Sequence, residues 1–139
     1  MTLKKNVKMK NQIENIREFQ DRIAEKIEGS LLDRQIPYEL RVKAAELMKL
    51  LLQEEVDELT EAMDNGDIVE ILDAGVDILY IVLGTMHEYE LLDKFEQAWD
   101  LIHKNNMSKL GRDGRVLKNE FGKVVKPTNY KPVNLNTLF

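Results

Sequence analysis

Residues 51–84 read LLQEEVDELTEAMDNGDIVEILDAGVDILYIVLG, and this stretch decides the fold. Apolar residues recur at helical spacing on both sides of DNGD, a stop signal in which Asp64 or Asp67 is suited to cap the element that follows. The stretch therefore predicts two consecutive helices, one ending near Met63 and the next running from Ile68 to about His87. Carboxylates occupy positions in both helices where the core-facing side is expected.

The first of these helices places an acid among its apolar residues. At about 100° per residue, Glu55 falls inside the apolar arc and Glu58 on its shoulder. Glu54 lies at the edge of the arc. Asp57 and Glu61 fall on the opposite side, where we expect water to solvate them. The phase of Glu55 contradicts the alternative reading, a surface charge run.

The second helix carries one acidic stripe, made of Glu70, Asp73 and Asp77. The rest of this helix is apolar nearly all round, which is typical of a buried helix. We therefore expect the stripe to be buried or to line a cleft. Gly84 lies on the same stripe and leaves room for another group to approach closely.

Several carboxylates on buried faces need compensation. Burying one unpaired charge costs several kcal/mol, and neighbouring like charges raise the pKa of each carboxyl further. Protonation, basic partners or a metal ion are the three remedies, and the helices offer few inward cations. Oxygen ligands without cysteine favour Mg²⁺, with Mn²⁺ as the alternative.

The length and composition of the chain exclude several classes of protein. The chain has 139 residues, which predicts a single domain, 1–139, with a hydrophobic core. Its net charge of -5 does not indicate a nucleic-acid partner, and the absence of cysteine excludes thiolate chemistry and disulfides. No signal-peptide pattern or membrane-spanning apolar run is present, so a cytoplasmic protein is expected.

The remaining patterns predict an all-α, four-helix bundle-like fold. Further helices are expected from about Gln12 to Ile27 and from about Leu92 to Ser108, and the helix containing Glu55 is expected to begin near Tyr38. Residues 1–10 hold four lysines and predict a flexible tail. Residues 111–139 form a basic tail, in which residues 116–117 and 124–125 predict a short hairpin around KNEFG.

Three motifs together resemble a known superfamily. EEVDE on one helix and EILDAGVD on the next are similar to the acidic pattern of the all-α nucleoside triphosphate pyrophosphohydrolases, which include MazG-like proteins, dimeric dUTPases and phosphoribosyl-ATP pyrophosphohydrolases. NNMSKL and GKVVKPTNYKP resemble the corresponding segments of a MazG-like subgroup. The resemblance covers roughly residues 12–132.

The resemblance implies that Glu55, Glu58 and Asp77 are metal ligands. The chain departs from the family pattern three residues before Asp77, where it has Ala74 instead of glutamate. Asp73, one residue further back on the same face, is suited to replace that glutamate. The alternative is that EILD itself supplies the pair, Glu70 and Asp73; we favour Asp73 with Asp77, and treat Glu70 as a reserve ligand.

The resemblance also implies a reaction. Mg²⁺ would join the acids to a nucleoside triphosphate, and water activated by Glu54 would attack the α-phosphorus, releasing a nucleoside monophosphate and pyrophosphate. Phosphate contacts are expected from Asn106, Lys109, Lys123 and Lys126. The expected role is cleaning of the nucleotide pool by a homodimer or homotetramer, with dUTP or a non-canonical nucleotide as substrate.

Three alternative functions have weaker support from the sequence. Phosphoribosyl-ATP hydrolysis shares the acidic signature. A ferritin-like di-iron bundle needs Glu-x-x-His on two helices, and Asp100 with His103 is the only near match. A non-catalytic helical interaction module predicts neither Mg²⁺ binding nor pyrophosphate release.

Overall fold

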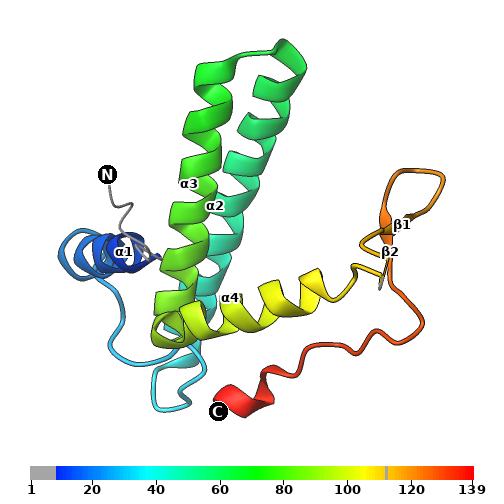
Figure 1. The fold of residues 1–139 in the computed structure, drawn as a ribbon. Helices are drawn as coiled ribbons and strands as arrows, with labels where there is room; N and C mark the ends of the chain where they lie inside the picture. The colour runs from blue at the N-terminus through cyan, green and yellow to red at the C-terminus, as the bar shows by residue number, and fades with distance from the viewer. Residues whose placement is uncertain (1–8, 112) are drawn as a thin grey trace, which may run out of the picture. The chain divides into compact units, whose positions relative to one another are not determined.

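The computed structural model describes residues 9–111 and 113–139 (Figure 1). The flexible tail expected at residues 1–10 therefore falls mostly outside the described residues, as does Arg112. The internal contacts of the chain divide it into two compact units, Met1–Asp93 and Lys94–Phe139. The single-domain assignment stays a prediction, and each unit is described by itself.

The first unit is built on a hairpin of two long helices, α2 (Tyr38–Asn65) and α3 (Ile68–Glu88), which pack against each other (Figure 1). Gly66 ends α2 with a left-handed φ of 64°, a conformation that glycine adopts without steric cost. Asp67 then begins α3, because its carboxylate accepts a hydrogen bond from the N–H of Glu70 at 3.2 Å. Of the two predicted caps, Asp67 is the one used.

The shortest helix of this unit, α1 (Lys10–Arg22), packs against α3 (Figure 1). Ile16 on α1 and Leu83 on α3 are both 1% exposed and form the core of this contact. Small buried residues, Ala62 on α2 and Ala74 on α3, belong to the core of the hairpin. The core of this unit therefore consists of one face of each helix.

The helix α1 ends earlier than its apolar pattern predicts. We expected it to continue to about Ile27, but regular structure stops at Arg22 and Glu25 has a φ of 51°. The Lys26 ammonium donates to the carbonyls of Ile27 and Gly29 at 2.7 and 2.9 Å, and to the Glu90 carboxylate at 2.8 Å. These bonds stabilise an irregular loop in place of another helical turn.

The helix α3 is less buried than its sequence predicts. Within this chain six of its large hydrophobic residues are exposed: Ile68, Val69, Leu72, Val76, Leu79 and Tyr80. A two-helix hairpin covers only one side of each helix, and α1 covers part of α3 alone. The expectation of a helix buried all round is therefore wrong for the single chain.

The second unit contains most of α4 (Leu92–Met107), whose first two residues belong to the first unit. A short antiparallel hairpin follows, in which β1 (Leu117–Lys118) pairs with β2 (Val124–Val125). The predicted hairpin around KNEFG is confirmed. A 3₁₀ turn, η1 (Leu135–Leu138), lies close to the end of the chain.

Four α-helices and one small hairpin confirm the all-α prediction for the described residues. Their boundaries agree with the sequence to within a few residues for α2, α3 and α4. None of the helices in the described part of the chain is both long and apolar enough to cross a membrane.

We predict that Leu83→Ala lowers the free energy of unfolding by about 2–5 kcal/mol, because it removes buried methyl groups and leaves a cavity between α1 and α3. Urea denaturation followed by circular dichroism measures the change. The control is Leu32→Ala, since Leu32 is 73% exposed and a surface truncation should shift stability by less than about 0.5 kcal/mol. Equal effects of the two substitutions would show that the α1–α3 contact is not a core.

Candidate active site

Two carboxylates of α2 face two carboxylates of α3. Burial raises the pKa of Glu55, and the negative charges of Glu58, Asp77 and Asp73 raise it further. Coulombic influence falls off with distance, so Glu55 lies within electrostatic range of these three acids.

Glu55 contacts Glu58, but one of its two carboxyl oxygens is buried. Its side chain is half-buried, and its Oε2 makes no hydrogen bond with any residue in 9–111 or 113–139. A buried carboxylate oxygen without a donor is unfavourable, and a bound cation would satisfy it. Glu58 and Asp73 are exposed, whereas Asp77 is half-buried like Glu55.

The donor set suits a hard divalent cation, although the side chains are not gathered around one point. Among the described residues, no three Asp, Glu, His or Cys side chains lie close enough to hold a metal ion as they stand. The chemistry nevertheless fits Mg²⁺ or Mn²⁺, since the charges of three further carboxylates act on Glu55 and one of its oxygens has no partner among the described residues.

The remaining predicted acids lie outside this cluster. Glu70 lines an open groove of about 300 Å³ near the α2–α3 turn, together with Glu58 and Glu61. Glu61 is exposed, as expected for the solvated side of the helix. Glu54 is exposed, and the described residues offer it no hydrogen bond or ion pair.

Three of the four predicted phosphate contacts gather around Tyr130 in the second unit. The ammonium groups of Lys109 and Lys126 lie 5.9 and 5.2 Å from the centre of its ring. Lys109 donates to the carbonyl oxygen of the Asn106 side chain at 3.0 Å, and Asn105 donates to the Tyr130 hydroxyl at 2.6 Å. We call these five residues the Tyr130 cluster.

This cluster carries uncompensated positive charge. Each ammonium is attracted to the face of the Tyr130 ring, but such contacts are weak at exposed positions. Within the described part of the chain, neither Lys109 nor Lys126 forms an ion pair with a carboxylate. The fourth predicted residue, Lys123, lies in the hairpin turn, where its backbone N–H donates to Asn119 at 3.0 Å.

A cavity of about 210 Å³ lies among α1, α2 and α3, and sequence reasoning missed it. Gln20 and Glu88 line it, with 9% and 5% of their surface exposed. Gln20 Oε1 and Glu88 Oε2 have no hydrogen-bond partner among the described residues, and each such atom costs about 1–3 kcal/mol. Gln20 follows Ile16 by one turn, so the rule that singled out Glu55 would also have found it.

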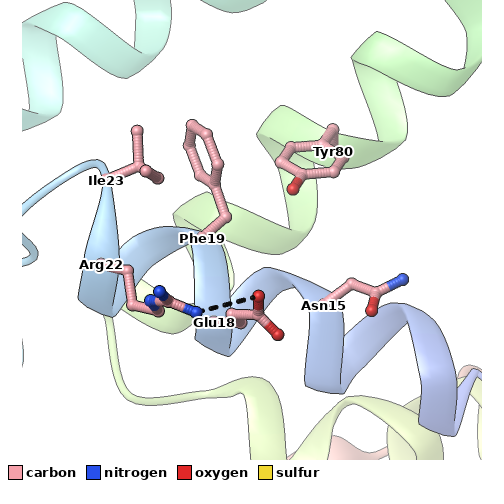
Figure 2. Close-up of a pocket in the computed structure, with 6 residues that line it drawn as sticks. All are labelled: Asn15, Glu18, Phe19, Arg22, Ile23 and Tyr80. Atoms are coloured by element: carbon pink, nitrogen blue, oxygen red, sulfur yellow. Dashed lines mark ion pairs between the residues drawn. The ribbon is translucent and has the colours of Figure 1, made fainter.

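Phe19 and Tyr80 separate this cavity from an open groove on the outer side of α1. Figure 2 shows their rings, which meet edge to face with centres 5.2 Å apart. The outer groove, about 440 Å³ in volume, is bordered below by Glu18 and Arg22, an exposed ion pair at 3.6 Å (Figure 2). Such an exposed pair contributes little to stability.

We predict that Glu55→Gln raises the melting temperature of the metal-free protein, and that the gain grows as the pH rises above 4.5, the ordinary pKa of the group. Folding raises the Glu55 pKa, so its protonated form stabilises the fold. That contribution is complete below the ordinary pKa and is lost as the pH rises through the raised pKa. Glutamine keeps the shape and stays neutral. Thermal melts from about pH 4 to about pH 8 test this.

The matched control is Asp57→Asn, two residues further along α2 at an exposed position, where Asp57 accepts a hydrogen bond from Gln53 at 2.8 Å. Its melting temperature should change little across the same pH range. A lower melting temperature for Glu55→Gln at neutral pH would mean that the ionised carboxylate has a stabilising partner.

Comparison with known proteins agrees with these features. The phosphoribosyl-ATP pyrophosphohydrolase family matches residues 16–106. Uncharacterized protein L479 of Acanthamoeba polyphaga mimivirus is 37% identical over 71 residues, which are 51% of this chain and 28% of that protein. The chain thus spans about a quarter of the length of this relative. Family membership supports hydrolysis of a pyrophosphohydrolase type, and the family in general depends on divalent metal. The chain belongs to the phosphoribosyl-ATP pyrophosphohydrolase family, within the MazG-like all-α nucleoside triphosphate pyrophosphohydrolase superfamily.

Proposed function

We propose that this protein hydrolyses a nucleoside triphosphate to the monophosphate and pyrophosphate in a Mg²⁺-dependent reaction. The observation that carries the proposal is Glu55, whose pKa is raised by burial and by three facing carboxylates, and whose Oε2 has no partner among the described residues. A purely structural acid cluster would be unfavourable, whereas a cation-binding cluster explains the arrangement. Mn²⁺ is an alternative cation of similar preference.

In this proposal Glu55, Glu58, Asp73 and Asp77 hold the cation, with Glu70 as a reserve ligand. A bound Mg²⁺ neutralises the acids, orients the phosphates and lowers the pKa of a bound water. The water oxygen attacks the α-phosphorus, and the bond between that phosphorus and the oxygen bridging to the β-phosphate breaks. Pyrophosphate leaves with that oxygen.

Glu54 is the proposed general base. It lies next to Glu55 in the chain and is exposed, so it can receive the proton of the attacking water and return it to solvent. An exposed carboxylate that is not itself a proposed metal ligand is suited to this role.

The Tyr130 cluster is the proposed contact for the phosphates. Lys109 and Lys126 repel each other near one ring, and a phosphate between them would relieve the repulsion. Asn106 holds Lys109 in place. Lys123 stays a candidate contact, on the hairpin next to Lys126.

Nucleotide-pool cleaning is the proposed role, in the cytoplasm, with dUTP and non-canonical nucleotides favoured by the resemblance to dimeric dUTPases and MazG-like proteins. Phosphoribosyl-ATP is the second candidate substrate, because its hydrolase family matches the chain. A homodimer or homotetramer is proposed because apolar side chains on α2 and α3, among them Leu50, Val56 and Leu72, are exposed in the single chain.

We predict pyrophosphate and a nucleoside monophosphate as products, with activity in Mg²⁺ or Mn²⁺ and none after addition of EDTA. In ¹⁸O-labelled water the label should enter the monophosphate, because water attacks the α-phosphorus. A panel of canonical and modified triphosphates and phosphoribosyl-ATP, assayed for pyrophosphate, selects the substrate. Formation of diphosphate and orthophosphate would refute the mechanism. No turnover and no Mg²⁺-dependent rise in melting temperature would favour an interaction module.

We predict that Lys126→Ala lowers kcat/KM by about 10-fold or more, because it removes a charge-assisted contact to the phosphates. The melting temperature should change little, since Lys126 is exposed. The matched control is Lys118→Ala on β1, which is equally exposed and has no proposed contact. If Lys126→Ala leaves the kinetics unchanged, Lys126 does not contact the phosphates and the basic tail is only solvated.

A further inference from the structure

The cavity among α1, α2 and α3 combines apolar walls with two polar groups. Leu47, Met48 and Leu51 of α2 line one part of it, and the aromatic pair Phe19 and Tyr80 lines another. The loop after α1 contributes the last side, with Ala24 and Ile27 among its residues. Apolar walls with a few convergent polar groups are typical of small-molecule sites.

The two polar groups, Gln20 and Glu88, are the unusual part of this lining. The Gln20 amide lies directly over Gly84, where an added Cβ would collide with its nitrogen. Glu88 follows Gly84 by one turn, so both polar groups border the same face of α3. Gln20 Oε1 and Glu88 Oε2 are buried acceptors without a partner among the described residues.

The buried Oε2 of Glu88 has no donor among the described residues. Burial raises the pKa of Glu88, although the positive charge of Lys26 acts in the opposite direction. Lys26 itself is occupied by Glu90 and two backbone carbonyls. A ligand that donates hydrogen bonds inside the cavity would satisfy both acceptors.

The cavity lies beside the acid cluster. Leu51 precedes Glu55 by one helical turn and Ile81 follows Asp77 by one turn, and both line the cavity. From Asp77 to Gly84 the distance along α3 is about 10 Å, which is comparable to the span from the 5′ end of a nucleoside to the far edge of its base. A nucleotide with its phosphates at the acids therefore reaches Gln20 with its base.

The volume of the cavity and its two hydrogen-bond acceptors limit which nucleotide bases could bind there. The volume of about 210 Å³ is below the range of about 300–1,000 Å³ for drug-sized ligands, which favours one ring over two. Phe19 and Tyr80 provide aromatic surface against which a base can pack. Two unpartnered acceptors can both be satisfied by the two hydrogens of one exocyclic amino group, which cytosine presents where uracil has a carbonyl; the ring N3–H of uracil offers a single hydrogen.

We propose that this cavity binds the base of the substrate, and that Gln20 and Glu88 select cytosine-type bases over uracil by accepting hydrogen bonds from the exocyclic amino group. The inference rests on the proposed function for the orientation of the nucleotide, and it replaces dUTP, which the resemblance alone favoured, by a cytosine nucleotide as the preferred substrate. It makes Gln20 and Glu88 specificity-determining residues that act on the base and take no part in the attack at phosphorus.

The test compares dCTP with dUTP, which differ at this amino group, using the full chain with Mg²⁺. We expect the wild-type protein to prefer dCTP by at least about 10-fold in kcat/KM. Gln20→Met should lower kcat/KM for dCTP by about 10–100-fold and leave that for dUTP within about 3-fold. Gly84→Ala should act in the same direction, because its Cβ displaces the Gln20 amide. Gln97→Met, at an exposed position on α4, is the matched control and should change neither substrate.

A binding measurement separates this inference from the proposed function. Calorimetry with dCMP and dUMP without Mg²⁺ should show preferential binding of dCMP that Gln20→Met abolishes, even if the protein hydrolysed no triphosphate. Equal binding of the two monophosphates, or binding of neither, would overturn the inference, as would an equal loss of activity on both triphosphates in Gln20→Met. If Gln20→Met does not fold, the wild-type preference and Gly84→Ala decide the matter by the same criteria.

Discussion

Repulsion among carboxylates across the α2–α3 hairpin is the constraint to which the rest of the first unit is adapted. Burial and three like charges raise the pKa of Glu55 and thus weaken the apo protein wherever the group is ionised. Tight packing of the two helices, through small residues such as Ala62 and Ala74, keeps the acids close despite this repulsion. A bound cation would compensate this repulsion, which is the physical basis for the proposed metal site.

The hairpin also leaves the first unit incompletely covered. α1 packs on α3 around Ile16 and Leu83, but apolar residues further along α3 stay exposed in the single chain. Two helices cannot bury two apolar faces each, because each helix contacts its neighbour along one stripe. The exposed faces are the physical basis for proposing an oligomer, in which further helices cover them.

Several polar groups share one property, which is that they lack a partner of complementary charge or hydrogen-bonding type among the described residues. Glu55, Gln20 and Glu88 each place an unpartnered oxygen in a buried position, where proteins normally satisfy such atoms. The Tyr130 cluster shows the opposite sign, with two ammonium groups near one ring and no described carboxylate to pair with them. Oxygens that need a cation or a donor, and ammonium groups that need an anion, are the complementary contacts a nucleotide and its metal ion would supply.

The amino-acid sequence by itself determined the all-α class, the helices α2, α3 and α4 and the pairing of acids on adjacent helices, since helical period and the DNGD signal are local properties. It did not determine the end of α1, because that depends on Lys26 meeting Glu90, 64 residues away. The exposure of α3 and the cavity at Gln20 and Glu88 likewise depend on which helices pack together. Tertiary structure alone decided these features, because burial is a property of the neighbours that a residue meets and not of its own periodicity.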